Sequence, residues 1–302
     1  MPETAQPDAA QPDAARGASA LRTPAQRTGA EGTIRDDLGR GLNLRQLLVV
    51  VYLFLLVGWP LWRVVQETFF SGENYLVSAL QDPAIQYALQ VTLAATAWAV
   101  VLNTVFGITV GILLVRYEFP GKRALSALLD LPTSVSPIVV GLSLLLAYGP
   151  IHGVLGGPLF DLGIRLIFSF PGIVLAVTFI SLPLVLRAVV PVLQEVGTEQ
   201  EMAAKSLGAS GFQVLRRITL PSIRWAAAYG IVLTLARAVG EFGAVVIVSG
   251  GVVGQTETAT IAVQRLHQGF ETGHAYAVGF LLALIAVAAL VIVTILRPSE
   301  KR

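Results

Sequence analysis

Charged and hydroxyl-bearing side chains are rare inside the long apolar runs of this sequence, so those that occur there are the first candidates for chemistry. Arg237 and Glu241 fall in one such run, and Ser134 and Ser136 fall in another. A guanidinium or hydroxyl within a membrane can donate hydrogen bonds to a dehydrated anion, whereas hydrocarbon side chains offer no donors. These residue types point to anion translocation rather than to covalent catalysis.

Each of these candidates also has a purely structural interpretation. Arg237 and Glu241 are four residues apart, so on a helix they share a face and can form a buried pair that joins spans. Ser134 and Ser136 lie beside Pro132 and Pro137, where a bend frees backbone carbonyls, and their hydroxyls can bond their own backbone instead. The sequence leaves both interpretations open.

Composition identifies the class of protein that carries these residues. The chain has 302 residues, of which 54% are hydrophobic and 13% charged, with a mean hydropathy of +0.71. Such values indicate a polytopic membrane protein. Cysteine is absent from the sequence, which excludes disulfides, thiolate metal sites and cysteine nucleophiles. His152, His267 and His274 are too scattered to form a metal site, and we expect no metal in this chain.

Six charge-poor runs are long enough to span the hydrocarbon, which requires about 20 apolar residues. They cover roughly residues 47–66, 86–115, 127–149, 169–193, 226–250 and 275–296. Within the second run, Gly107 and Gly111 predict a close contact with another helix. Residues 1–45 are rich in Ala, Pro, Gln and Asp and predict a disordered tail, followed by one membrane domain over residues 46–302.

The distribution of basic residues predicts the orientation of the spans. All but four of the 21 Lys and Arg residues fall in the N-terminal tail, in the second and fourth connections or at the C-terminus, if Arg187 is counted with the fourth connection. Arg63, Arg165 and Arg265 fall in the other connections, and Arg237 falls within the fifth run. The positive-inside rule therefore predicts six spans with both termini in the cytoplasm.

The only sizeable cytoplasmic connection runs from about residue 194 to 225. Its segment "TEQEMAAKSL" is a good helix former after Thr198, "GASG" can break the helix with glycines at positive φ, and "FQVLRRI" resumes a helix before Pro221. The two short helices would form an L-shaped element at the membrane face. Such an element either lies on lipid headgroups or docks a cytoplasmic partner.

This connection resembles the EAA loop of ABC-importer permease subunits, in which E-A-A is followed by three residues, Gly, nine residues and I-x-L-P. The motif's Glu falls on Met202, and the neighbouring acids are Glu199 and Glu201. The other matching positions are Ala203, Ala204, Gly208, Ile218, Leu220 and Pro221. The resemblance implies that these residues form a docking loop for an ATPase subunit.

Two further runs resemble sulfate/thiosulfate permease subunits of the CysW type. They read "YEFPGKRALSALLDLPTSVSPIVVGL" from residue 117 and "ARAVGEFGAVVIVSGG" from residue 236. The resemblance implies an all-α, MetI-like permease fold that works by alternating access in a bacterial inner membrane. Molybdate permeases are similar over "GEFGA" and the loop, so a molybdate or tungstate permease is the alternative.

The chain lacks parts that such an importer needs. It has no G-x-x-x-x-G-K-[ST] sequence, since Arg116 stands where the glycine before Gly121-Lys122 is required. We therefore expect no cofactor in this chain, and ATP and Mg bound by a partner ATPase dimer. The outer connections are also too short to form a binding domain. The resemblance implies an extracytoplasmic sulfate-binding protein and a second, CysT-type permease chain as partners, within the lipid bilayer and without nucleic acid.

Two other classes of protein remain as alternatives. An ion-coupled secondary transporter is expected to carry intramembrane carboxylates for coupling and a repeated half. This sequence has one deep carboxylate, Glu241, beside an arginine, and no repeat. A membrane scaffold without transport needs no arginine within a span. Copurification of a P-loop ATPase distinguishes the importer from both.

Overall fold

The computed structural model describes residues 44–70, 74–151 and 153–296, apart from the side chains of Val293, Ile295 and Leu296. Most of the predicted N-terminal tail lies outside these residues. The described residues form helices and loops and contain no strand, which confirms the all-α fold class. The chain divides into a unit that ends at Gly58 and a unit that begins at Trp59.

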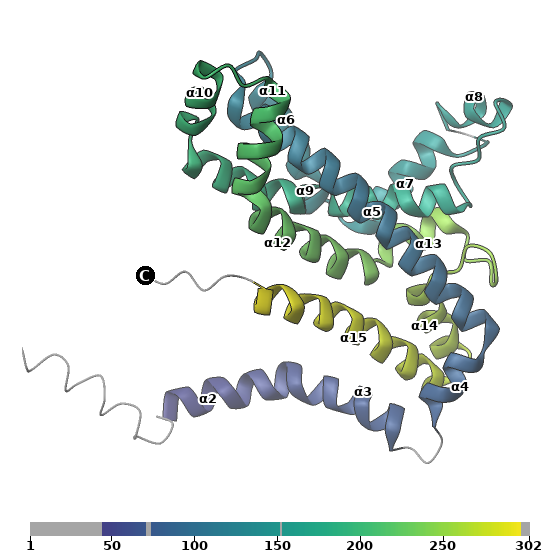
Figure 1. The fold of residues 1–302 in the computed structure, drawn as a ribbon. Coiled ribbons are helices and arrows are strands. Elements are labelled where there is room, and N and C mark those ends of the chain that lie inside the picture. The colour runs from purple at the N-terminus through teal and green to yellow at the C-terminus, as the bar shows by residue number, and fades with distance from the viewer. Residues whose placement is uncertain (1–43, 71–73, 152, 297–302) are drawn as a thin grey trace, which may run out of the picture. The chain divides into compact units, whose positions relative to one another are not determined.

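The helices follow one another with short connections. The first unit contains α2 (Leu44–Leu53) and the π-helix η2 (Phe54–Gly58). The second unit is shown in Figure 1 and contains α3 (Trp59–Phe69), α4 (Tyr75–Gln81), α5 (Pro83–Arg116), α6 (Lys122–Ser134), α7 (Pro137–Tyr148), α8 (Gly156–Asp161), α9 (Phe170–Val196), α10 (Glu199–Ser206), α11 (Gly211–Val214), the π-helix η3 (Leu215–Thr219), α12 (Leu220–Val239), α13 (Gly243–Ser249), α14 (Ala259–Gln268) and α15 (Thr272–Leu296).

Five helical stretches in the described residues are long and apolar enough to cross a membrane. They are Leu44–Phe69, Pro83–Arg116, Phe170–Val196, Gly211–Val239 and Thr272–Ile292. The pair α6 and α7 also passes this test together, but it is bent by 115°. Length and composition thus give five spans, or six if the bent pair counts as one.

The long helices α5 and α9 form the closest packed pair, and they run parallel. Asn103 of α5 donates to the Thr178 carbonyl (3.1 Å) and the Ser181 hydroxyl (2.9 Å) of α9. One turn further along both helices, a Cβ on Gly107 would lie 2.8 Å from the Val185 Cβ. The predicted close contact at Gly107 is therefore confirmed, and small residues permit it because nothing else lets two backbones approach so nearly.

Helix α12 packs on the same helix, α9, in the opposite direction. Helix α12 starts near the place where α9 ends, because only the short elements α10, α11 and η3 lie between these two helices in the chain. A Cβ on Gly230 would lie 2.8 Å from the Val185 Cα, so the two backbones touch at this crossing. In Figure 1, α10 and α11 lie at one end of the α5, α9 and α12 layer, and α4, α8 and α14 lie toward the other.

The predicted third span is not one kinked helix. The structure begins α6 at Lys122 and breaks after Ser134, with a bend of 115° before α7. Pro137 causes the break, because proline lacks an N–H and holds the preceding residue extended; Ser136 accordingly has φ −59° and ψ 136°. Pro132, by contrast, lies inside α6.

The predicted fifth span, residues 226–250, is also corrected. The structure has one continuous helical stretch from Gly211 to Val239, then a break at residues 240–242 and the short α13. The freed backbone groups at the break find partners: the Ala244 N–H donates to the Glu241 carboxylate (3.0 Å), and the Thr260 hydroxyl donates to the Glu241 carbonyl (2.9 Å). A broken helix within a membrane protein requires such partners.

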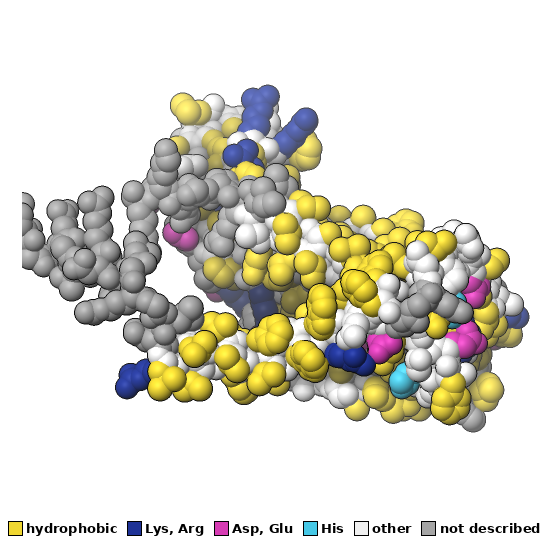
Figure 2. All heavy atoms as spheres, turned by 90° about the horizontal axis from the view of Figure 1, so that it is seen from below, with side chains coloured by type: hydrophobic (Ala, Val, Ile, Leu, Met, Phe, Trp, Pro, Cys, Tyr) yellow, Lys and Arg dark blue, Asp and Glu magenta, His cyan; other side chains and the backbone are white. Residues whose placement is uncertain are grey.

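The surface of the helices fits a lipid environment. Hydrophobic side chains cover much of the face seen in Figure 2. On α5, for example, Trp98, Leu102 and Val105 are all exposed although the helix is among the most apolar in the chain. A water-soluble protein rarely exposes so continuous an apolar surface.

We expect Gly230→Ala to destabilise the protein, because overpacking a tight contact costs about 1–3 kcal/mol. Gly279→Ala is the matched control: Gly279 lies within α15, and nothing lies within 4 Å of where its Cβ would be. The control change is expected to be neutral or to stabilise by up to about 1 kcal/mol, since alanine favours a helix over glycine. Thermal unfolding in detergent measures both variants, and equal melting temperatures would contradict the α9–α12 contact.

Candidate functional site

The predicted glycine corner between α10 and α11 is confirmed. Gly208 has φ +86°, a conformation that only glycine adopts without strain. The Gly208 N–H donates to the Lys205 carbonyl (2.9 Å), and the Ala209 N–H donates to the Ala204 carbonyl (3.0 Å). This is the Schellman arrangement, which satisfies the last carbonyls of a helix while the chain turns away. Thr198 stands at the N-cap of α10, as expected, but its hydroxyl makes no capping bond.

The second helix of the loop begins with a capping box. The Ser210 hydroxyl accepts from the Gln213 N–H (3.3 Å), and the Gln213 side chain accepts from the Ser210 N–H (2.8 Å). This helix does not stop before Pro221, because the π-helix η3 precedes the proline and its wider turn accommodates a residue that lacks an N–H. The loop is therefore continuous with α12.

An ion pair that the sequence did not predict anchors α10 to the long helices. Arg116, the last residue of α5, donates to the Glu201 carboxylate (3.2 Å) and to the Leu193 carbonyl of α9 (3.0 Å). Glu201 also accepts from the Thr219 hydroxyl (2.9 Å). The Arg116 and Glu201 side chains are only 9% and 13% exposed. One cluster thus ties α10 to the ends of α5 and α9 and to η3.

Met202, which occupies the position of the motif's Glu, makes no part of this cluster and is exposed. The acidic contact is made by Glu201, one residue earlier and about 100° around the helix. The charge on Arg116 and the acids Glu199 and Glu201 near Met202 were the sequence signals for this ion pair, but Arg116 and Glu201 are 85 residues apart in the sequence. Sequence spacing alone does not identify such a pair.

Three of the remaining loop positions share one hollow. Ala204, Gly208 and Ile218 line a shallow hollow of about 370 Å³ between the two short helices. Ala203, Leu220 and Pro221 are exposed nearby along the chain. Leu207 at the corner is 90% exposed, and Phe212 is also exposed. Bare apolar side chains around a hollow are typical of a surface that a partner covers.

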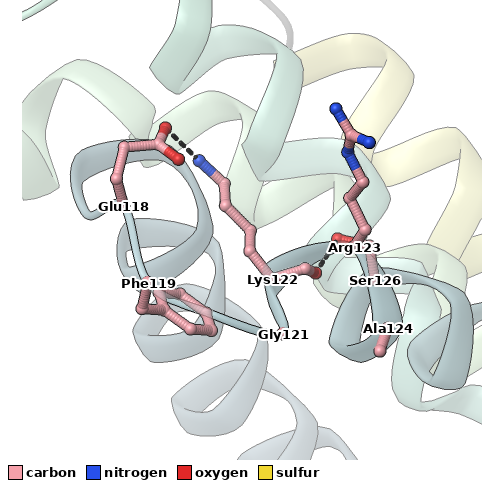
Figure 3. Close-up of a pocket in the computed structure, with 7 residues that line it drawn as sticks. All are labelled: Glu118, Phe119, Gly121, Lys122, Arg123, Ala124 and Ser126. Carbon is pink, nitrogen blue, oxygen red and sulfur yellow. Dashed lines mark hydrogen bonds and ion pairs between the residues drawn. The ribbon is translucent and has the colours of Figure 1, made fainter.

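The turn between α5 and α6 adds basic residues to this end of the molecule (Figure 3). Lys122 pairs with Glu118 at 2.6 Å, and the Arg123 side chain points away from that pair. Gly121 has φ +88°, which lets the chain reverse before α6. The turn lies near α10 and α11 in Figure 1.

The predicted pair Arg237 and Glu241 is formed, although the helix ends between the two residues. The Arg237 guanidinium lies 2.8 Å from the Glu241 carboxylate; Glu241 is 2% exposed and Arg237 is 41% exposed. The second oxygen of Glu241 accepts the Ala244 N–H at the start of α13. The carboxylate is therefore a fixed structural group, whereas the guanidinium reaches the protein surface.

Ser134 and Ser136 lie at the other break and are exposed. Among the described residues neither hydroxyl has a hydrogen-bond partner, so the structure does not support their bonding to their own backbone. The two breaks lie against each other, because a Cβ on Gly243 would be 2.8 Å from the Pro137 Cβ. The fold therefore brings the four predicted pathway residues to the neighbourhood of one junction, between α7 and α13.

Arg187 was assigned to the fourth connection, and this assignment is wrong. It lies inside α9, nine residues before the helix ends at Val196. Its guanidinium donates to Asp130 of α6 (2.7 Å) and to the Thr133 hydroxyl (3.0 Å). The run that contains Arg187 remains apolar on average, which is why a count of charges between runs misplaced it.

A further pair lies at the opposite end, away from α10. Glu257, in the loop before α14, is fully buried and binds Arg265 at 2.7 Å. The hydrogen bond that Arg265 donates to Glu257 raises the pKa of Arg265 above its usual value, and the negative charges of Glu257, Glu271 and Asp82 add to this. The pair holds the loop before α14 in place.

Comparison with known proteins places these features in a family. Residues 104–302 match the model of a family described as "Binding-protein-dependent transport system inner membrane component". The sulfate transport system permease protein CysW of Synechocystis is 44% identical over 249 residues, which is 82% of this chain and 90% of the relative. CysT of Salmonella typhimurium is 33% identical and covers 87% of this chain and 93% of its own length.

The fold is also found in a solved structure. The crystal structure of a bacterial ABC transporter involved in the import of the acidic polysaccharide alginate superposes with a TM-score of 0.71. It covers 90% of this chain and 99% of the solved chain at 18% identity, so the likeness concerns the fold.

We expect Glu201→Ala to loosen the loop, since it leaves the Arg116 guanidinium buried without its counter-ion. Removing one member of a buried pair costs about 3–5 kcal/mol. Hydrogen exchange of residues 197–215 is expected to accelerate and the melting temperature to fall. Glu199→Ala is the control, because Glu199 lies on the same helix and is exposed. If both variants exchange alike, the cluster does not anchor α10.

Proposed function

The chain belongs to the inner membrane components of binding-protein-dependent transport systems, and from this premise we propose that it is the permease subunit of an ATP-driven sulfate importer. The observation that supports sulfate as the substrate is the 44% identity to a sulfate transport system permease over 90% of that relative's length. The chain would move sulfate or thiosulfate through the cytoplasmic membrane by alternating access. The assembled complex, rather than this chain, would hydrolyse ATP.

Six spans are supported by the direction of α5 and α9. Because the two helices are parallel, α9 starts at the membrane face where α5 starts. The chain between them must therefore return across the membrane, and α6 with α7 is the only apolar helical pair among the described residues of 117–151 and 153–169. The bent pair would thus be a broken span and not a loop that re-emerges on the same side.

The basic residues support a cytoplasmic position for the α10 end. Lys122, Arg123 and Lys205 lie there, together with Arg216 and Arg217 of η3. Moving Arg187 into α9 removes one charge from this end but does not reverse the asymmetry. With six spans, the positive-inside rule then puts both termini in the cytoplasm. We retain residues 1–45 as a tail and residues 46–302 as the permease domain.

The α10–α11 loop is our candidate for the surface that docks the ATPase. Its hollow is lined by Ala204, Leu207, Gly208 and Ile218, and Met202 on α10 is also exposed. The Arg116–Glu201 cluster would make the loop move with α5 and α9. ATP and Mg would be bound by the ATPase subunits, and this chain would carry no cofactor of its own.

Two other protein partners complete the proposed importer. Transport systems of this family depend on a binding protein, and an extracytoplasmic sulfate-binding protein would deliver the anion. Similarity to both CysW and CysT relatives, at 44% and 33% identity, supports a CysW-like role with a CysT-type sister chain as the second permease. The pathway would pass the junction of the two breaks, with Ser134, Ser136 and Arg237 as donors and Glu241 as the fixed counter-ion.

The proposal predicts that cells lacking this chain lose uptake of labelled sulfate and regain it when the chain is restored. Gly208→Val is expected to reach the membrane but to abolish uptake and ATPase copurification, since a side chain at φ +86° costs about 1–2 kcal/mol and disturbs the corner. Gly211→Ala is the control, because Gly211 lies in the same loop, outside the positive-φ region and with open space around it.

The same cells distinguish the alternatives. If the cells take up molybdate or tungstate but not sulfate, the substrate assignment is wrong and the assignment as an ATP-driven importer stands. Sulfate uptake that persists without ATP and collapses with the ion gradient would indicate a secondary transporter and contradict the proposal. Normal copurification of the ATPase with Gly208→Val would remove the docking role of the corner.

Single cysteines test the topology, since the native chain contains none. In spheroplasts, a membrane-impermeant thiol reagent is expected to label Leu162→Cys, which lies exposed after α8. Leu207→Cys, on the exposed corner of the docking loop, is expected to react only after the membrane is opened. If closed spheroplasts are labelled at Leu207→Cys and not at Leu162→Cys, the chain has the opposite orientation to the one proposed. Labelling of both positions would contradict the six-span arrangement.

A further inference from the structure

A second pair of charges lies within the spans and has no role in the proposed pathway so far. Arg187 of α9 donates through Nε (3.1 Å) and Nη2 (2.7 Å) to the same oxygen of Asp130 on α6. Nη2 also donates to the Thr133 hydroxyl at 3.0 Å. The pair joins two helices and lies deep within both. Arg187 is about 14 Å from the end of α9, and Asp130 is about 12 Å from the start of α6.

The exposure of this pair is unusual for its depth. The Arg187 and Asp130 side chains are 52% and 57% exposed in the chain. Charged groups at such depth avoid lipid and face either a bundle interior or a water-filled cavity. A pair that served only to join α6 and α9 would be expected to lie buried between them. The exposed faces of both side chains therefore indicate that something polar passes or remains beside them.

The surroundings of the pair supply further hydrogen-bond donors. Ser134 follows Asp130 by one helical turn on α6, and Ser136 stands at the break before α7. Both hydroxyls are exposed and lack partners among the described residues. One guanidinium and two free hydroxyls beside a broken helix are the donors that a dehydrated oxyanion requires.

The crossing of α9 and α12 gives the position of this site relative to Arg237. The helices are antiparallel and touch where Gly230 meets Val185. Arg187 lies two residues beyond Val185 toward the α10 end, and Arg237 lies seven residues beyond Gly230 in the other direction. At about 1.5 Å per residue, the backbone positions of the two arginines are separated by about 14 Å along the helices. They would be met in sequence by an anion that crosses the membrane.

We propose that Arg187 is a second contact for a tetrahedral dianion inside the membrane, on the side of Arg237 nearer the docking loop, and that Asp130 is the competing counter-ion that lets the anion leave. The inference rests on the proposed function, because it takes the cargo to be an oxyanion. A lone guanidinium holds a dianion tightly, and passage requires sites that bind weakly enough to release. Asp130 occupies the guanidinium when the anion has moved on.

The test uses the assembled complex in nanodiscs, so that reagents reach both faces of the membrane. The complex carries the single substitution Ser134→Cys. A positively charged thiol reagent is expected to label this cysteine, and sulfate is expected to protect it. Leu128→Cys is the matched control, because Leu128 lies on the same helix, is exposed and is turned about 200° away from Asp130. The control is expected to react slowly and to show no protection by sulfate.

The sulfate concentration that gives half protection then measures the site. Adding Arg187→Gln is expected to raise it by about 10- to 100-fold, the loss expected for a charge-assisted hydrogen bond. Adding Asp130→Asn is expected to lower it by about tenfold, because the competing charge is gone. Changes in opposite directions distinguish a binding site from a structural pair, which would give two equally impaired complexes and unchanged protection.

Two further variants keep the test decisive if Arg187→Gln does not assemble. Arg187→Lys retains the charge without the guanidinium's two parallel donors and is expected to weaken protection only in part. The double change Arg187→Gln with Asp130→Asn leaves no unpaired charge and is expected to assemble yet to lose protection. Undiminished protection in the assembled double variant would overturn the proposal, and so would a Ser134→Cys that reacts no faster than Leu128→Cys.

The choice of anion separates this inference from the proposed function. Sulfate, thiosulfate and molybdate are compared, with chloride at equal ionic strength as a further control. Protection by molybdate alone, lost with Arg187→Gln, supports the Arg187 site and corrects the cargo of the importer. Protection by chloride equal to that by sulfate would overturn the inference, because the site would then respond to ionic strength only.

Discussion

The parallel contact of α5 and α9 is the constraint on which the rest of the structure depends. In a membrane, helices gain little from hiding apolar surface, so association relies on close backbone approach and on hydrogen bonds between helices. Gly107 supplies the approach, and Asn103 supplies the hydrogen bonds. Because the contact is parallel, Arg116 at the end of α5 is brought beside the end of α9. In the six-span arrangement that we propose, α6 and α7 return the chain across the membrane between them.

A second consequence is that two breaks in the spans lie together. Gly141 of α7 and Ala244 of α13 pack backbone against backbone, since a Cβ on Gly141 would lie 2.8 Å from the Ala244 carbonyl oxygen. Each break leaves polar groups in an apolar region; at residues 240–242 the Glu241 carboxylate and the Thr260 hydroxyl supply partners, whereas Ser134 and Ser136 at the other break stay unpaired among the described residues. The carboxylate of Glu241 binds Arg237 and the Ala244 N–H, whereas the arginines and serines nearby retain exposed hydrogen-bond donors. Exposed donors suit a pathway that carries an anion.

The α10–α11 loop keeps a buried acidic contact although Met202 stands at the position of the motif's Glu. Met202 leaves the motif without its usual acid, yet Glu201 places a carboxylate against Arg116 and Thr219. The cluster involves four elements, so movement of α10 is transmitted to α5 and α9 rather than absorbed by the corner. The corner itself is rigid, because the Schellman bonds at Gly208 fix its direction.

The sequence by itself determined the features that depend on local composition: the helical class, the presence of several membrane-spanning apolar runs, the glycine corner at Gly208 and the close contact at Gly107. Hydropathy is a sum along the chain, so it locates spans but not their bends or partners. Only the tertiary structure decided that α6 and α7 meet at 115°, that the helix continues through Pro221, and that Arg187 of α9 binds Asp130 of α6. The physical reason is that these features depend on contacts between residues far apart in sequence, such as the 57 positions that separate Asp130 from Arg187.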